Sequence, residues 1–299
     1  MSVAKFSAPS LFRPSASGGG KGGGAPAHTS RWHSFRVNVR DAFALLFRPP
    51  RGASARPRWR SASRVTVGLL LALPIIFATM FFIDTPTVRA VAALPGWVPE
   101  VFDQVSDFGT SDWFLVPTAV MLAGLGALAT PALSQTSRLV VVTAAIRIGF
   151  IFDAIALPGL FVTVIKRLIG RARPYVGDTS DPFLYKPFVW HPEYASLPSG
   201  HATNVFAALV AIGLIFPRLR AVMLLYALAI AAARVLVSAH HVSDVIAGAI
   251  AGTVGALLVR DWFAARRLGF VIEPDGHVRT LPGPSLARLI RVASKLLSA

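Results

Sequence analysis

The chain of 299 residues contains no cysteine, and only 14 of its residues are Asp or Glu. The absence of cysteine excludes disulfides, thiolate catalysis and cysteine-ligated zinc or iron–sulfur sites. Charged residues make up only 15% of the chain, whereas hydrophobic residues make up 54% and the mean hydropathy is +0.59. A soluble domain carries more charge, and a disordered basic tail is far less apolar. The composition therefore indicates an integral membrane protein.

The net charge of +16 lies almost entirely in two tails. Residues 1–64 hold twelve bases and one acid, a net charge of 12 − 1 = +11, and residues 260–299 hold seven bases and three acids, a net charge of 7 − 3 = +4. Basic residues gather on the cytoplasmic side of membrane proteins, so this charge reports topology. A nucleic-acid binder needs basic residues clustered on a folded face, and we expect no nucleic-acid partner.

Apolar runs between the tails have the length of membrane-spanning helices, which need about 20 apolar residues. An even number of spans places both tails on the cytoplasmic side. The sequence predicts an all-α, six-transmembrane helical bundle (65–262) between a partly disordered basic cytoplasmic tail (1–64) and a second basic cytoplasmic tail (263–299). The six predicted spans are 65–83, 113–133, 139–165, 200–216, 219–239 and 242–259.

Each tail contains an apolar stripe at helical spacing beside basic residues. The first stripe runs from Phe35 to Phe47 beside Arg36 and Arg40, and the second runs over residues 286–297. This pattern is typical of helices that lie on anionic lipid headgroups. For the first tail, a frayed segment fits the sequence equally well. A Gly-rich run at 18–27 is low-complexity and is predicted to be disordered.

The predicted external loop from 166 to 199 departs from the positive-inside pattern. It holds five cations, whereas the first external loop, at about 84–112, is acidic. External cations indicate either contact with lipid phosphates or a dedicated anion site. Arg167, Arg171 and Lys186 suit a multiply charged headgroup or anionic lipid. The five cations are Lys166, Arg167, Arg171, Arg173 and Lys186.

Three polar clusters fall at the external ends of predicted spans three to six. Two of them contain planar guanidinium groups, which suit a tetrahedral oxyanion. In the second cluster a serine and a glycine open a predicted helix, whose free N–H groups and dipole favour an anion. The clusters are Lys166 with Arg173 and Pro174; Ser196 with Pro198, Ser199, Gly200 and His201; and Arg234 with His240 and Asp244.

The third cluster supplies a candidate nucleophile. His240 and Asp244 are four residues apart, so on a helical turn they share a face. A carboxylate there holds one imidazole nitrogen protonated and leaves the other free to attack. His201 remains for general acid catalysis on the leaving oxygen. These residues indicate phosphoryl transfer through a phosphohistidine, without a metal or another cofactor.

The three clusters resemble the signature motifs of the phosphatidic-acid phosphatase type 2 superfamily, which contains membrane lipid phosphatases, soluble acid phosphatases and vanadium haloperoxidases. The resemblance covers residues 166–244. It implies phosphate binding by Lys166, Arg173, Ser199, Gly200 and Arg234, with catalytic His240, Asp244 and His201. The sequence departs from the family pattern at Ala233, where a serine is usual, and at His241, where an aromatic residue is frequent.

The resemblance implies an enzyme that dephosphorylates a membrane lipid phosphate or diphosphate, with its active site on the periplasmic side of a bacterial inner membrane. Undecaprenyl diphosphate, phosphatidylglycerol phosphate, phosphatidic acid and lipid A are the substrate candidates. A lipid phosphotransferase uses the same residues, and six spans alone also fit a lipid transporter or scaffold. Haloperoxidase activity is disfavoured because those relatives are soluble.

Two further features of the sequence lie outside these motifs. Arg147 and Asp153 fall inside the third predicted span, where charges are costly. Asp153 lies 13 residues before Lys166, about 20 Å along a helix, so we expect structural pairing in the bundle and not catalysis. The aromatic side chains between Tyr175 and Tyr194 predict an interfacial belt; a gate for acyl or prenyl chains is the alternative.

Overall fold

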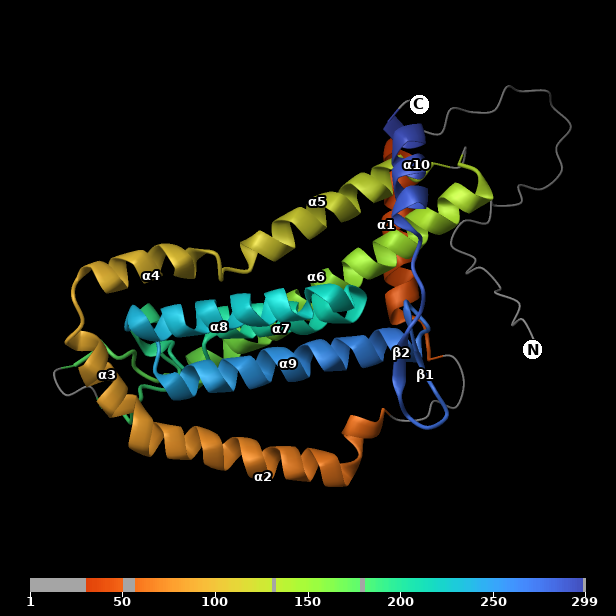
Figure 1. Cartoon of the computed structure of the whole chain (residues 1–299). Coiled ribbons are helices and arrows are strands. Elements are labelled where there is room, and N and C mark those ends of the chain that lie inside the picture. The colour runs from red at the N-terminus through yellow and green to blue at the C-terminus, as the bar shows by residue number, and fades with distance from the viewer. Residues whose placement is uncertain (1–30, 51–56, 131–132, 178–180, 298–299) are drawn as a thin grey trace, which may run out of the picture.

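The computed structural model describes residues 31–50, 57–130, 133–177 and 181–297, and in them the chain is mainly helical (Figure 1). The Gly-rich run at 18–27 lies outside these residues. The helices are α1 (Arg31–Phe47), α2 (Ala62–Thr79), α3 (Thr85–Ala92), α4 (Trp97–Asp107), α5 (Asp112–Leu128), α6 (Gln135–Ile169), α7 (Gly200–Ile215), α8 (Arg220–Leu236), α9 (Val242–Ala265) and α10 (Leu286–Leu297).

Within these residues, five helical stretches are long and apolar enough to cross a bilayer. They run over Ala62–Ala92, Trp97–Leu128, Gln135–Ile169, Pro217–Leu236 and Val242–Ala265. Large apolar side chains on their outer faces are exposed, as Leu70 on α2 and Leu225 on α8 show. A lipid environment covers such surfaces, whereas water does not. The protein is therefore an integral membrane protein built as a helical bundle.

The fourth predicted span, 200–216, corresponds to α7, which has only 16 residues. This helix packs against α6, α8 and α9, and nearly all of its inward residues are buried. Two glycines of α9 permit the close approach of α7 and α9. A Cβ atom at Gly248 would lie 2.4 Å from the carbonyl oxygen of Ser199, and one at Gly252 would lie 2.2 Å from that of Thr203. Small residues serve this purpose between membrane helices.

The first external segment is helical, although the sequence predicted a loop at about 84–112. A π-helical turn, Met80–Asp84, continues α2 into α3, and α4 follows. The acidic residues of this segment lower its average hydropathy, so its apolar periodicity was overlooked. The apolar face pairs α4 with α8. The turn also directs Asp84 inwards, where its side chain is fully buried. The segment therefore covers the end of the bundle.

The opposite end of the bundle is closed by the two tails. Figure 1 shows α1 and α10 running across the axes of the bundle helices at this end. The amide of Asn38 on α1 donates to the carbonyl oxygens of Gly126 and Ala129, at 2.9 and 2.8 Å. A hairpin of β1 (Phe270–Ile272) and β2 (Val278–Thr280) follows α9, and Phe270 packs on Phe150 of α6 with ring centroids 4.6 Å apart.

The two charged residues inside α6 differ in their contacts. Arg147 donates to the carbonyl oxygen of Leu281 at 2.5 Å, at the end of the bundle that the hairpin closes. Asp153 is half-buried and makes no side-chain hydrogen bond or ion pair within the described part of the chain. The prediction of structural pairing is wrong for Asp153, because the inward neighbours on this helix, Phe150 and Ala154, face an apolar core.

Candidate active site

The three clusters predicted from the sequence meet at one end of the bundle. Lys166 lies in the last turn of α6, Gly200 begins α7, and Arg234 lies in the last turn of α8. A backbone hydrogen bond of 3.0 Å from the Ser199 N–H to the Asp244 carbonyl joins the start of α7 to the first turn of α9. Residues from the whole length 166–244 therefore converge, although they are far apart in sequence.

The start of α7 is arranged to receive an anion. The Ser199 side chain caps the helix and accepts a hydrogen bond from the Ala202 N–H. Within the described residues, the N–H groups of Gly200 and His201 have no protein acceptor. The Lys166 ammonium lies 3.7 Å from where a Cβ of residue 200 would stand. Free N–H groups, a helix dipole and an ammonium group are thus placed together, as phosphate binding requires.

Two guanidinium groups complete the cationic side of the site. Arg173 donates from Nε to the carbonyl oxygen of Pro192 at 3.1 Å. Arg234 is buried and donates to the hydroxyl of Ser106 on α4. Lys166 lies close enough to both arginines to experience their charges. A lipid phosphate neutralises such a cluster of like charges, so the arrangement favours a bound anion.

The candidate nucleophile lies behind these cations. His240 is buried in the connection between α8 and α9. Its Nδ1 atom is 3.8 Å from Oδ2 of Asp244, which is beyond hydrogen-bond length. The hydroxyl of Ser196 lies beside both groups: it donates to Oδ2 of Asp244 at 2.6 Å and is 3.4 Å from Nδ1 of His240. The Nδ1 side of the ring therefore faces Ser196 and Asp244, and Nε2 is left for chemistry.

Electrostatics keeps the His240 imidazole neutral. The pKa of His240 is lowered to about 4, mainly by burial; Asp244 opposes this shift, and the positive charges of Arg234 and Arg173 add to it. Neutral imidazole is the nucleophilic form. The next residue, His241, is also buried, and burial lowers its pKa as well. His241 therefore occupies its position as a neutral ring.

The α4–α5 connection covers the other candidate catalytic histidine. A Cβ atom at Gly109 would lie 3.0 Å from Cδ2 of His201, so the backbone of this connection lies directly against the ring. His201 also experiences the charges of Arg234, Lys166 and Arg173, and it lies close to His240. The predicted candidates thus form one cluster, and the external helices that cover it were missed by sequence reasoning.

Two further residues of the cluster were not predicted. Arg171, which the sequence suggested for headgroup binding, is fully buried and donates to Asp84 and Asp244 at 2.8 and 2.5 Å. Arg171 therefore does not face a headgroup. Asp84 counted in the sequence only as an external acid. The only sequence feature that pointed to Arg171 was the unusual density of cations after Lys166. That density does not show which of these side chains are buried.

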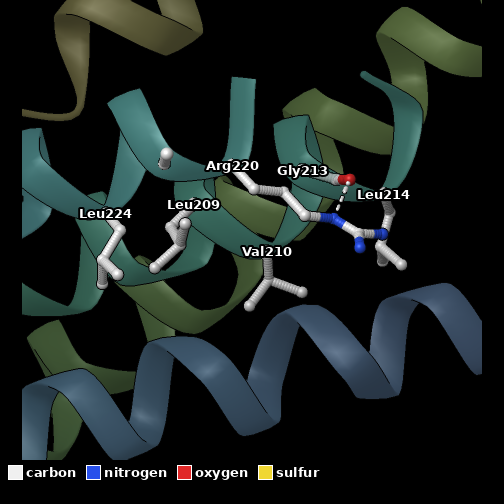
Figure 2. Close-up of a pocket in the computed structure, with 7 residues that line it drawn as sticks. Leu209, Val210, Gly213, Leu214, Arg220 and Leu224 are labelled. Atoms are coloured by element: carbon white, nitrogen blue, oxygen red, sulfur yellow. Dashed lines mark hydrogen bonds between the residues drawn. The ribbon is translucent and has the colours of Figure 1, made fainter. Parts of the chain in front are cut away.

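A pocket of about 370 Å³ lies away from this cluster, between the last turns of α7 and the start of α8 (Figure 2). In Figure 2 the Arg220 side chain extends over α7, where its Nε donates to the Gly213 carbonyl oxygen at 2.8 Å. The lining is apolar apart from Arg220 and holds none of the predicted site residues. It consists of Leu209, Val210, Gly213, Leu214, Arg220, Ala221 and Leu224.

Comparisons with known proteins show which proteins this chain is similar to. Residues 147–268 match the PAP2 superfamily. The chain is 34% identical over 252 residues to a lipid A 1-phosphatase of Rhizobium johnstonii, covering 81% of this chain and 98% of the relative. A lipid A 1-phosphatase of Rhizobium etli is 32% identical over 223 residues, with 73% and 91% covered. A solved PAP2-type phosphatidylglycerolphosphate phosphatase from Bacillus subtilis is 20% identical, with a TM-score of 0.46, over 66% of this chain and 94% of that one.

An apolar helical bundle that carries an oxyanion-binding cluster at one end has the architecture of an integral-membrane phosphatase. The extent and identity of the match to the first relative settle the family. This chain belongs to the PAP2 superfamily, and it is a lipid phosphatase. The family and the enzyme class predicted from the sequence are confirmed.

Proposed function

We propose that this chain removes the 1-phosphate of lipid A. The observation that carries the proposal is the pair of relatives named for this activity, which the chain matches over almost their whole length. The site supports it, because three cations and the start of α7 lie close together beside a neutral, buried His240. Such a site binds a phosphate monoester and holds a nucleophile against it.

The reaction proceeds in two steps. Nε2 of His240 attacks phosphorus, the bond from phosphorus to the lipid oxygen breaks, and His201 protonates that oxygen. The resulting phosphohistidine carries a positive ring, which Asp244 stabilises through Ser196. A water molecule then attacks phosphorus and gives a proton to His201, the bond from phosphorus to Nε2 breaks, and inorganic phosphate leaves as the neutral His240 imidazole is restored. Lys166, Arg173 and Arg234 stabilise the charge on the phosphoryl oxygens, the role that a metal ion has in other phosphatases.

The site faces the periplasm of a bacterial inner membrane in this proposal. Basic residues of α1 and α10, such as Arg36 and Arg288, lie at the end of the bundle opposite the site, and the positive-inside rule makes that end cytoplasmic. The cysteine-free chain allows a direct test. An impermeant maleimide should label Glu100→Cys, an exposed position on α4, in spheroplasts, and should label exposed Ser285→Cys only after lysis. The reverse pattern would refute the orientation.

The crosswise helices α1 and α10 lie on the anionic surface of the cytoplasmic leaflet in this proposal. Ile290 of α10 is 57% exposed, although it is apolar, and Arg288 is also exposed. A basic amphipathic helix of this kind binds anionic lipid. A nitroxide on Ile290→Cys should be relaxed by oxygen, which dissolves in lipid, and one on Arg288→Cys by an aqueous nickel complex. Equal exposure of both labels to the nickel complex would refute this placement.

Phosphate release from purified lipids tests the proposed activity. The wild-type protein should release inorganic phosphate from lipid A and leave a product that lacks the 1-phosphate, and His240→Ala should release none. Undecaprenyl diphosphate, phosphatidylglycerol phosphate and phosphatidic acid are assayed in parallel, and faster turnover of any of them would overturn the lipid A assignment. Radiolabel from the donor should appear as free phosphate; label on an acceptor lipid would show a phosphotransferase instead.

Trapping of the intermediate tests the proposed mechanism. After rapid quenching at alkaline pH, wild-type protein should carry label from the substrate phosphate on His240. Retained turnover in His240→Ala, or label on another residue, would refute the assignment of the nucleophile.

A further inference from the structure

A buried ion network lies directly behind the catalytic cluster. Its centre is Arg171, whose side chain is fully buried. Nη1 donates to Oδ1 of Asp244 at 2.5 Å and to the Ser243 hydroxyl at 2.7 Å, and Nη2 donates to Oδ2 of Asp84 at 2.8 Å. Nε donates to the carbonyl oxygen of Pro182 at 2.9 Å. Every nitrogen of the guanidinium group therefore has a defined partner.

Asp84 reaches this network from the other side of the bundle. It ends the π-helical turn after α2, and its oxygens accept from the Ser243 N–H at 3.0 Å and from the Ser243 hydroxyl at 2.5 Å. Both contacts are in the first turn of α9, where a carboxylate is favoured by the helix dipole. Asp84 therefore fixes both Arg171 and the start of α9, the turn that carries Asp244.

The network is costly to build and has a net charge. Burying three ionised groups carries a desolvation penalty that good geometry only partly offsets. The positive charge on Arg171 is held in place by the negative charges of Asp244 and Asp84, which raise the pKa of Arg171 in spite of its burial. One cation between two carboxylates leaves a net charge of −1. That charge lies on the Nδ1 side of His240, the side on which positive charge develops when Nε2 attacks phosphorus.

We propose that Arg171, anchored by Asp84, is a positioning residue that holds the Asp244 carboxylate against Ser196 and thereby orients His240. The proposal rests on the proposed phosphohistidine reaction. Neither Arg171 nor Asp84 contacts the phosphate site, so both act through Asp244. In the free enzyme, the charged and titratable groups next to His240 are Asp244 on α9, Arg234 on α8, Arg173 after α6 and His201 on α7. Arg171 and Asp84 act on His240 from behind Asp244.

The experiment compares Arg171→Met, Arg171→Lys, Asp84→Asn and the double variant Asp84→Asn/Arg171→Met with wild type. Exposed residues provide matched controls: Arg89→Met for the arginine and Glu100→Gln for the acid. Phosphate release from micellar lipid gives kcat, KM and the pH profile of kcat/KM, and thermal unfolding measures folded protein. Each network variant should lower kcat about 10- to 100-fold, with KM within about threefold of wild type. Both controls should match wild type.

The pH profile distinguishes positioning from simple destabilisation. Arg171→Met removes a positive charge near His240, so its acidic limb should move to higher pH. Asp84→Asn removes a negative charge, so its limb should move to lower pH. The double variant restores the net charge of −1, and its limb should return towards that of wild type. A purely structural role predicts neither the opposite shifts nor their cancellation.

The outcomes separate this proposal from the function on which it rests. If wild type is inactive on every lipid, the proposed function fails and the positioning role fails with it. If wild type is active and the folded network variants keep its kcat, the positioning role alone is overturned. The same holds if the variants lose activity only in proportion to the amount of folded protein and their acidic limb is unchanged. Should Arg171→Met not fold, Asp84→Asn and Arg171→Lys decide the question by the same measurements.

Discussion

Replacement of Ser196 by alanine tests how the carboxylate of the site reaches the nucleophile. The Ser196 hydroxyl is buried and contacts both groups, at 2.6 Å from Oδ2 of Asp244 and 3.4 Å from Nδ1 of His240. Asp244 itself is 3.8 Å from Nδ1, and its other oxygen is held by Arg171. Removal of the hydroxyl should therefore leave the imidazole without its nearest polar partner on the Nδ1 side.

The size of the effect follows from the type of bond that is lost. A hydrogen bond to a charged group contributes about 1.5–3 kcal/mol. If that energy is realised when the phosphohistidine forms, kcat falls about 10- to 150-fold, since about 1.4 kcal/mol corresponds to a factor of ten. KM should stay nearly constant, because the hydroxyl lies on the Nδ1 side of the ring and away from the cations that bind phosphate.

The assay measures phosphate release at saturating lipid together with the amount of trapped phosphohistidine. Ser111→Ala is the matched control, because the Ser111 hydroxyl also contacts a carboxylate, that of Asp112 at 3.3 Å, but at the exposed start of α5. The control should keep wild-type kcat and KM. Ser196→Ala should fold normally, bind substrate normally and form less phosphohistidine per unit time.

Two results would refute the reasoning. A kcat within a factor of two of wild type would show that Asp244 reaches Nδ1 without the hydroxyl. A large rise in KM at constant kcat would place Ser196 in phosphate binding, contrary to its position behind the ring.

Three other predictions follow from the structure. Gly252→Ala should lower the unfolding temperature, because its Cβ would lie 2.2 Å from the Thr203 carbonyl oxygen, whereas Gly124→Ala, with nothing within 4 Å, should not; equal melting of the two would contradict the α7–α9 packing. Activity should persist in excess chelator, because we propose that cations of the chain bind the phosphate. A loss of activity that a divalent metal reverses would refute the metal-independent mechanism. Mainly through burial, the pKa of His240 is lowered to about 4, below its unfolded value of about 6.5. Unfolding temperatures should therefore fall as pH drops from about 6.5 to about 4, and should fall less steeply in His240→Gln. Identical slopes would refute a contribution of His240 to this pH dependence.

Much of the fold was predictable from local composition. Apolar runs of membrane length and the asymmetry of basic residues indicated a helical membrane bundle, and all six runs correspond to helices of the structure. The same rules failed at 84–112, because they weigh hydropathy and charge over a window. The short helix α4 carries three acids, Glu100, Asp103 and Asp107, which lower that average, while its apolar face still packs on the bundle.

The candidate site was predictable for a different reason. The residues of each cluster lie close together in sequence, so helix geometry alone places them on one face or at one end of a helix. The clusters are Lys166–Arg173, Ser199–His201 and Arg234–Asp244. The roles assigned to these residues stay predictions. Contacts between distant segments have no such local signature, so the contact between Arg171 and Asp244 could not be predicted from the sequence.

The sequence by itself determined the environment of this protein, its family and the residues of its signature clusters. These properties depend on composition and short-range spacing, which one chain displays directly. Only the tertiary structure decided that Arg171 is buried between Asp84 and Asp244 instead of facing solvent, and that Ser196 contacts both Asp244 and His240. The physical reason is that a buried charge is tolerated only beside its partners, and here the two carboxylates that hold Arg171 come from positions 87 and 73 residues away.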